Sequence, residues 1–300
     1  MHVPITARIG MVNYINTAPI YESWKKRVHP AQWQMVEAPP STLNRMLAAG
    51  ELDLGFVSSH EYCVRPEIYR ILADLSISAN GSVGSVFLFS RVDPHKLDGC
   101  PVLLSGQSQT SIFLLKIILE EFYGVRPLYR VGDVVEDMSS GKDVQPQALL
   151  AIGDQALRLV GDERFPYQLD LGAVWRHYTG LPFVFALFAV REDFCQREPE
   201  TLARIHQELI ECVREGRQNL EAVCELAAPR IPMHPDDCYV YLRAIGYDLG
   251  AEKRLALERF FCYLIDRGEG SAQSLPLKMV ENVRQKAEGR RENNARGGSR

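Results

Sequence analysis

Residues 8–21 read RIGMVNYINTAPIY and predict a β-strand that runs directly into a helix. The strand ends near Val12, and Pro19 stands at the start of the helix, where its missing N–H costs nothing. Asn13 and Asn16 lie in the polar turn between the two. Because the first N–H groups of a helix have no partner within the helix, this turn is a potential anion-binding site.

A second turn of the same kind lies in residues 102–122, which read VLLSGQSQTSIFLLKIILEEF. An apolar strand is followed by polar residues 107–111 and then by an apolar helix. Ser108, Thr110 and Ser111 are therefore either ordinary caps of this helix or ligand-binding residues, and we favour ligand binding. Two such turns predict a small ligand with two anionic groups, held from two sides.

The order of the elements predicts an α/β fold. Strands at 8–12, 34–38 and 52–57 alternate with helices, an order that favours a parallel sheet. A second α/β series begins at residue 102, and apolar runs near 85–90 and 183–190 bracket it as two hinge strands.

This pattern predicts two lobes, each a mainly parallel sheet flanked by helices, with the ligand in the cleft between them. Lobe one is expected to combine residues 1–90 with residues 190–280, which include the C-terminal helices. Lobe two is expected to span 91–189. Residues 281–300 are polar without an apolar face, which predicts a disordered tail.

Composition excludes several classes of partner. The chain has 300 residues, 46% of them hydrophobic, and a net charge of −4 without a polycationic face, so no nucleic acid is expected. The apolar stretches are too short to span a bilayer, and no signal peptide is apparent. Seven cysteines without CxxC spacing predict reduced thiols in a cytoplasmic protein. We expect this protein to be a monomer or a homodimer. No metal or cofactor is expected.

No standard catalytic signature such as GxGxxG, HExxH or GxSxG is present, so the site candidates are residues at strand ends. Asn16 is a cleft amide or a turn residue, and we favour the amide because α/β sheets bind ligands at strand C-terminal ends. Asp154 is more naturally an N-cap than a cleft carboxylate. Phe183 packs against a flat ring or belongs to the core. The remaining candidates are Ser58, Ser59, Ser85, Val86 and Thr179.

Seven segments together carry a family resemblance: GMVNYINTAPI, LDLGFVSSHEY, SVGSVFLFS, SQTSIFLLKIIL, AIGDQAL, DLGAVWRHYTGLPFVFALFAVR and YLRAIGYDLG. In this order they resemble the chorismate dehydratases of the futalosine route to menaquinone, over about residues 9–267. The resemblance implies a type II periplasmic-binding-protein-like fold and a lyase that dehydrates chorismate to 3-[(1-carboxyvinyl)oxy]benzoate. It also implies that Asn16 and Ser85 are the catalytic residues of the cleft.

Two questions stay open at this point. The base that removes the proton is either a carboxylate of the substrate itself or one of Asp154 and His60. The function also has alternatives: a non-catalytic protein of the same fold that binds or senses small anions, and the sister 1,4-dihydroxy-6-naphthoate synthase. The N-terminus of that synthase usually reads like SPCPNDT, which NYINTAPI does not match.

Overall fold

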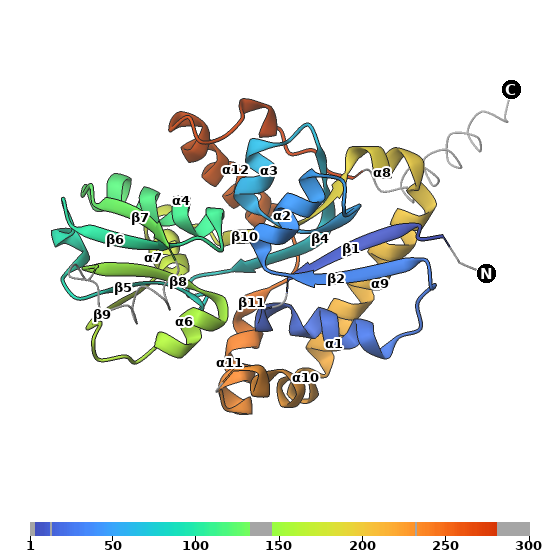
Figure 1. Cartoon of the computed structure of the whole chain (residues 1–300), viewed down its shortest axis with the longest axis horizontal. Coiled ribbons are helices and arrows are strands. Elements are labelled where there is room, and N and C mark those ends of the chain that lie inside the picture. Colours follow the sequence, from blue (N-terminus) through green and yellow to red (C-terminus); the bar gives the residue numbers. More distant parts are fainter. Residues whose placement is uncertain (1–3, 13, 133–145, 232, 281–300) are drawn as a thin grey trace, which may run out of the picture.

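Two β-sheets lie side by side in the computed structural model and form the centres of two lobes (Figure 1). The structure describes residues 4–12, 14–132, 146–231 and 233–280. Asn13 and the predicted tail at 281–300 lie outside the described residues.

The first sheet has six strands in the order β11-β4-β10-β3-β1-β2. β1 is parallel to β2 and β3, as the alternating strand–helix pattern predicts, whereas β10 runs antiparallel to β3 and β4. β11 is antiparallel to β4 at the sheet edge. The strands are β1 (Ala7–Val12), β2 (Trp33–Ala38), β3 (Leu54–Ser58), β4 (Tyr69–Ala79), β10 (Phe183–Arg191) and β11 (Ile245–Gly246).

The second sheet has five strands in the order β7-β6-β8-β5-β9. β6 is parallel to β7 and β8, and β5 is antiparallel to β8 and β9. Both sheets are therefore mixed rather than mainly parallel, because the strands adjoining the crossovers between lobes run against their neighbours. The strands are β5 (Val86–Ser90), β6 (Pro101–Ser105), β7 (Leu128–Gly132), β8 (Ala148–Ile152) and β9 (Tyr167–Asp170).

Helices cover both sheets and follow the predicted alternation, and the helical run from 199 to 227 is divided in two at Asn219. The helices of the first lobe are α1 (Ala18–Lys26), α2 (Pro40–Ala48), α3 (Ser59–Val64), α8 (Glu192–Arg197), α9 (Pro199–Gln218), α10 (Leu220–Ala227), α11 (Pro235–Ala244) and α12 (Ala251–Asp266). Those of the second lobe are α4 (Gln109–Ile117), α6 (Gly153–Leu159) and α7 (Leu171–Thr179). Short 3₁₀ helices are η1 (Ile15–Thr17), η2 (Pro94–Lys96), η4 (Ala228–Arg230) and η5 (Ala272–Ser274), and η3 (Ile118–Phe122) is a π-helical continuation of α4. Among the helices of the described ranges, none has the length and apolar composition needed to cross a bilayer.

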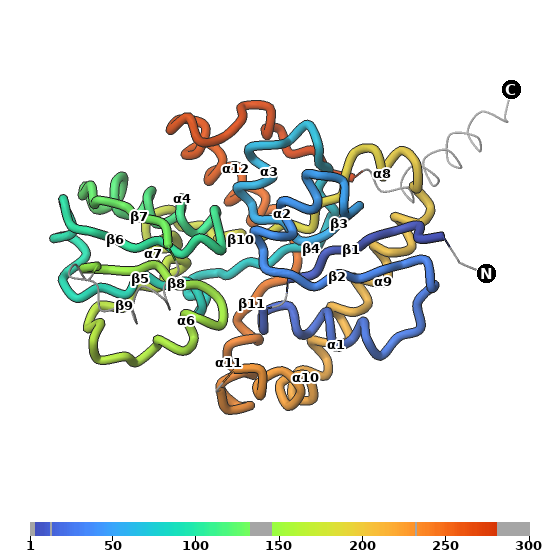
Figure 2. The backbone as a smooth tube through the Cα atoms, viewed as in Figure 1, coloured from blue at the N-terminus to red at the C-terminus, as the bar shows by residue number. Residues whose placement is uncertain are grey.

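The chain passes between the lobes twice, at residues 80–85 and 180–182 (Figure 2). These positions correct the predicted lobe boundaries. The strand at 86–90 pairs with β8 and β9 and so belongs to the second sheet, while the strand at 183–191 pairs with β3 and β4 in the first. Both runs are almost wholly buried, so hydrophobicity alone did not tell which sheet each one joins.

The hydrophobic core is continuous from one lobe to the other. Next to the second crossover, Trp175 packs edge-to-face against Phe183 and Phe260, with ring centroids 5.2 and 6.2 Å apart. α7 of the second lobe and α12 of the first thus share one aromatic cluster. This packing holds the crossover segments in place beside the cleft.

Candidate active site

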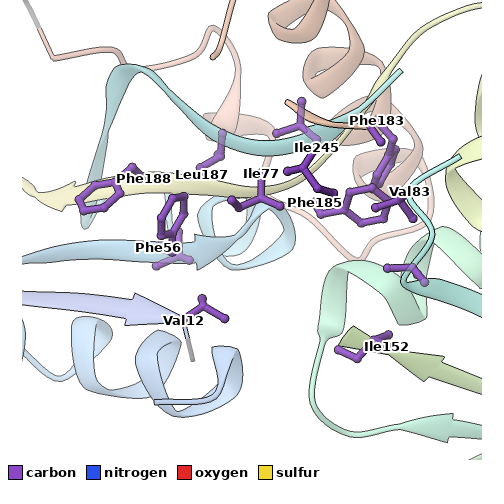
Figure 3. Packing of buried hydrophobic residues seen from close by; sticks show 14 of the residues in the cluster. Val12, Phe56, Ile77, Val83, Ile152, Phe183, Phe185, Leu187, Phe188 and Ile245 are labelled. Carbon is purple, nitrogen blue, oxygen red and sulfur yellow. The ribbon is translucent and has the colours of Figure 1, made fainter. Parts of the chain in front are cut away.

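A cavity of about 600 Å³, including its part open to solvent, lies between the two lobes. Its walls are largely apolar: Val12, Phe56, Ile77 and Phe185 lie along the first lobe and Ile152 lies on the facing lobe (Figure 3). Polar atoms are few and come from side chains at element ends. The polar side chains of the lining are Tyr14, Asn16, Ser58, Ser85, Ser108 and Ser111.

Several helix starts converge on this cavity. Ser58 caps α3 by accepting a hydrogen bond from the Glu61 N–H at 3.1 Å, and Ser108 caps α4 by accepting from the Ser111 N–H at 3.3 Å. Gly153 at the start of α6 also lines the cavity. The two turns predicted to bind anions, one before α1 and one before α4, therefore face the same space.

The electrostatics of the cavity favour an anion held by neutral donors. No Lys, Arg or His belongs to the described residues of the lining. The helix starts at Ser58, Ser108 and Gly153 supply partial positive charge instead, each worth roughly 0.3–1 kcal/mol to an anion and more where water is excluded. No group of three or more His, Cys, Asp or Glu within the described part of the chain is placed to hold a metal ion.

Asn16 and Ser85 both line the cavity. The side-chain Oδ1 of Asn16 is buried and has no hydrogen-bond partner among the described residues, and its main-chain oxygen accepts from the Tyr247 hydroxyl at 2.8 Å. The Ser85 side chain is buried, and its Oγ accepts from the Tyr241 hydroxyl at 2.9 Å. An orphaned buried acceptor beside a buried hydroxyl is expected at a ligand site, because a bound group can complete the missing contact.

The first crossover segment is built on a single carboxylate. Asp170, at the end of β9, accepts from the Ser82 hydroxyl at 2.6 Å and from the N–H groups of Val83 and Gly84 at 2.9 and 2.7 Å. The same side chain caps α7 through the Ala173 N–H at 3.1 Å. Because Ser85 follows directly, Asp170 sets the path of the chain into the site. The sequence analysis did not single it out.

Two glycines allow the backbone to follow this path. Gly84 has φ of +73°, a conformation that side chains with a Cβ rarely adopt. A Cβ on Gly172, two residues after Asp170, would lie 2.5 Å from the Gly81 carbonyl oxygen. The stretch DLGAVWRHYTG contains both the carboxylate of Asp170 and the glycine that permits the close approach. This pair is the sequence signal from which the role of Asp170 could have been predicted.

Five of the predicted binding residues, Ser59, Thr110, Asp154, Thr179 and Phe183, do not line the cavity, and the hydroxyls of the first two and of Thr179 have partners within the chain. The Ser59 hydroxyl donates to the Val184 carbonyl at 2.7 Å, and Thr110 Oγ1 accepts from the His60 N–H at 2.9 Å. Thr179 lies at the end of α7 and donates to the Trp175 carbonyl at 2.8 Å. Phe183 is buried in the aromatic cluster, which corresponds to the core alternative of the sequence analysis. Of the other predicted binding residues, Ser58, Val86, Ser108 and Ser111 line the cavity.

The two titratable side chains considered as bases also lie outside the lining. Asp154, in the first turn of α6, accepts weakly from the Ile15 N–H at 3.4 Å, and burial raises its pKa. His60 stacks on Phe113 with ring centroids 4.4 Å apart, and burial lowers its pKa to about 4. Neither side chain is among the residues that line the cavity.

Tyr14 is a lining residue that the sequence analysis missed, although it stands within the quoted NYINTAPI stretch. Its hydroxyl donates to Gln107 Oε1 at 2.6 Å, which joins the start of η1 in the first lobe to the loop before α4 in the second. Burial raises the pKa of the Tyr14 phenol, so the hydroxyl stays protonated and remains a donor. This contact links the lobes directly across the cavity.

Comparison with known proteins gives the following similarities. A family model described as menaquinone biosynthesis matches residues 7–265. A chorismate dehydratase from Thermus thermophilus is 32% identical over 268 residues, which are 84% of this chain and 93% of that protein. A 1,4-dihydroxy-6-naphthoate synthase from the same organism is 25% identical over 267 residues, 83% of this chain and 89% of that protein.

Among solved structures, the periplasmic aliphatic sulphonate binding protein of Escherichia coli aligns with a TM-score of 0.65 at 14% identity. The alignment covers 94% of this chain and 99% of that one. At this identity the similarity concerns the fold alone. It confirms the predicted two-lobed, periplasmic-binding-protein-like architecture.

Proposed function

The chain is an enzyme that belongs to the menaquinone-biosynthesis family, and from that premise we propose that it dehydrates chorismate to 3-[(1-carboxyvinyl)oxy]benzoate. The reaction would be the first step of the futalosine route. The observation that carries the proposal is the placement of Asn16 and Ser85 in one apolar cavity onto which helix starts from both lobes converge.

The cavity suits the shape and charge of this substrate. Chorismate has a six-membered ring, which becomes flat when it aromatises, and two carboxylates. The apolar wall with Phe56 and Phe185 offers a surface for the ring, while the turns at Asn16 and at Ser108–Ser111 offer N–H and hydroxyl donors for the two acid groups. We propose Ser58 and Val86 as further contacts, since both line the same space.

The proposed chemistry needs little beyond positioning. The C3–H bond breaks and its electron pair forms the C3–C4 double bond, while the C4 hydroxyl leaves and takes up a proton to form water. The ring becomes aromatic, which supplies the driving force. Positioning contributes on the order of 7–11 kcal/mol in the best intramolecular systems, and each hydrogen bond aimed at developing charge adds about 3 kcal/mol.

We propose that the enolpyruvyl carboxylate of the substrate accepts the C3 proton. The support is the composition of the described lining, in which Tyr14 is the one titratable side chain. Burial raises the pKa of that phenol, so it is not available as a base near neutral pH. The side-chain Nδ2 of Asn16 would donate to the carboxylate and orient it, and Ser85 would donate to the departing hydroxyl group.

The test is turnover of chorismate by the purified protein, followed by absorbance and mass of the aromatic product. Asn16→Ala and Ser85→Ala should each lower kcat about a hundredfold, a loss of roughly 3 kcal/mol. Ser90→Ala is the matched control, because Ser90 is a buried serine of the same strand region whose hydroxyl bonds to the Val92 carbonyl away from the cavity. Near-normal turnover by both cavity variants would contradict the assignment.

The similarity to a naphthoate synthase favours a second candidate, the sister reaction of the same pathway. Inertness towards chorismate would support that candidate, and binding without turnover would support a non-catalytic sensor. A cytoplasmic location is part of the proposal and rests on the expectation of reduced thiols from the cysteine pattern.

A further inference from the structure

The segment from Tyr241 to Tyr247 belongs to the quoted YLRAIGYDLG stretch, which the proposed function leaves without a role. It spans the end of α11 and β11 (Figure 1). β11 pairs with the end of β4, and Ser78 Oγ donates to the Gly246 carbonyl at 3.0 Å. Arg217 on α9 donates to the Ile245 carbonyl at 3.0 Å. The segment is therefore fixed both to β4 of the first sheet and to α9.

Each tyrosine of this segment contacts one of the two proposed catalytic residues. Tyr241 is 7% exposed and its hydroxyl donates to Ser85 Oγ at 2.9 Å. Tyr247 is 1% exposed and its hydroxyl donates to the Asn16 carbonyl at 2.8 Å. Ser85 follows the crossover segment and Asn16 lies in η1, so one anchored segment reaches both sides of the site.

We infer that Tyr241 and Tyr247 are positioning residues for the dehydration, with Tyr241 fixing the direction of the Ser85 hydroxyl and Tyr247 fixing the backbone that carries Asn16. The inference rests on the proposed function. It adds a role for two residues outside the set Asn16 and Ser85.

The direction of the Tyr241 contact decides what Ser85 can do. Burial raises the pKa of the Tyr241 phenol, so the phenol keeps its proton, and the geometry of the contact makes this hydroxyl the hydrogen-bond donor to Ser85 Oγ. With that lone pair engaged, the hydrogen of Ser85 points away from Tyr241, and Ser85 lines the cavity. Ser85 is thereby held as a hydrogen-bond donor towards the ligand, as departure of a hydroxyl group requires.

The Tyr247 contact acts on the backbone instead. Its hydroxyl holds the carbonyl of Asn16, which lies in η1 two residues before the start of α1, and so limits rotation of this turn. The Asn16 side chain, whose buried Oδ1 has no partner among the described residues, then keeps its orientation beside the cavity that the residue lines. Loss of the Tyr247 hydroxyl should weaken this orientation without removing any group that touches the substrate.

The experiment is a double-mutant cycle with Tyr241→Phe, Ser85→Ala and their combination, plus Tyr247→Phe. Tyr69→Phe is the matched control, because Tyr69 is fully buried and its hydroxyl donates to Glu61 Oε1 at 3.0 Å. Tyr241→Phe should lower kcat about tenfold with KM changed less than about twofold, and should cause no further loss in the Ser85→Ala background. Tyr247→Phe should also lower kcat about tenfold, and Tyr69→Phe should leave kcat within about twofold of the parent.

Wild-type-like kcat in both tyrosine variants would overturn the inference, as would an equal loss for Tyr241→Phe with and without Ser85. The same cycle read on chorismate affinity by calorimetry separates this result from failure of the proposed function. If the parent binds chorismate without turnover, the proposed dehydration is wrong. Coupling between Tyr241 and Ser85 in the binding affinities would then still support the positioning role, and additive effects of the two substitutions would still overturn it.

Discussion

Asp170→Asn is expected to destabilise the protein and to slow turnover together. One carboxylate oxygen, Oδ2, accepts from Ser82, Val83 and Gly84, while Oδ1 accepts from the Ala173 N–H and shares the Val83 N–H at 3.1 Å. An amide has a single acceptor oxygen, so it cannot serve both sides. With the oxygen towards the crossover segment, the cap of α7 is lost, which costs about 1 kcal/mol.

The three remaining bonds also lose the charge that strengthens them, which costs roughly 0.5–1 kcal/mol each. The total is a loss of about 3 kcal/mol in the free energy of unfolding. The opposite orientation of the amide is worse, because the NH₂ group then faces three donors. Since the crossover segment leads directly into Ser85, we also expect kcat to fall.

Urea denaturation measures the stability change, and turnover of chorismate measures the functional one. Asp93→Asn is the control, because Asp93 accepts one exposed hydrogen bond, from the His95 N–H at 3.0 Å. That variant should lose less than about 1 kcal/mol. If Asp170→Asn stays within about 0.5 kcal/mol of the control, the reasoning that one carboxylate organises the crossover is refuted.

Three further predictions follow from single contacts. Tyr14→Phe removes the 2.6 Å bond to Gln107 across the cavity, worth about 1 kcal/mol, so KM should rise about fivefold with little change in kcat; an unchanged KM in steady-state kinetics would contradict this. Burial lowers the pKa of His60 to about 4, whereas its pKa in the unfolded chain is near 6.5, so the parent protein loses stability as the pH falls from 6.5 towards 4. Over this range, denaturation at several pH values should show that His60→Gln loses roughly 2–3 kcal/mol less free energy of unfolding than the parent. Gly172→Ala brings a Cβ to 2.5 Å from the Gly81 oxygen and should lower the free energy of unfolding by about 1–3 kcal/mol, which would lower the urea concentration at the midpoint. An unchanged midpoint would show that the backbone shifts to accommodate the methyl group.

The sequence by itself determined the local elements and much of the polar lining. Alternating apolar and amphipathic runs are local signals, and the strands at 8–12, 34–38 and 52–57 lie close to their predicted positions. The capping residue Ser108 was likewise identifiable, because helix starts have their own residue preferences. The family resemblance identified Asn16 and Ser85, both of which line the cavity.

The tertiary structure alone decided which residues meet across the chain. Sheet membership of β5 and β10 depends on pairing with distant strands, and hydrophobicity is the same in either sheet. Tyr241 reaches Ser85 over a separation of 156 residues, and Asp170 reaches Gly84 over 86. Such contacts leave no periodic trace in a single sequence, because hydrogen bonds between side chains depend on how folded elements pack rather than on spacing along the chain.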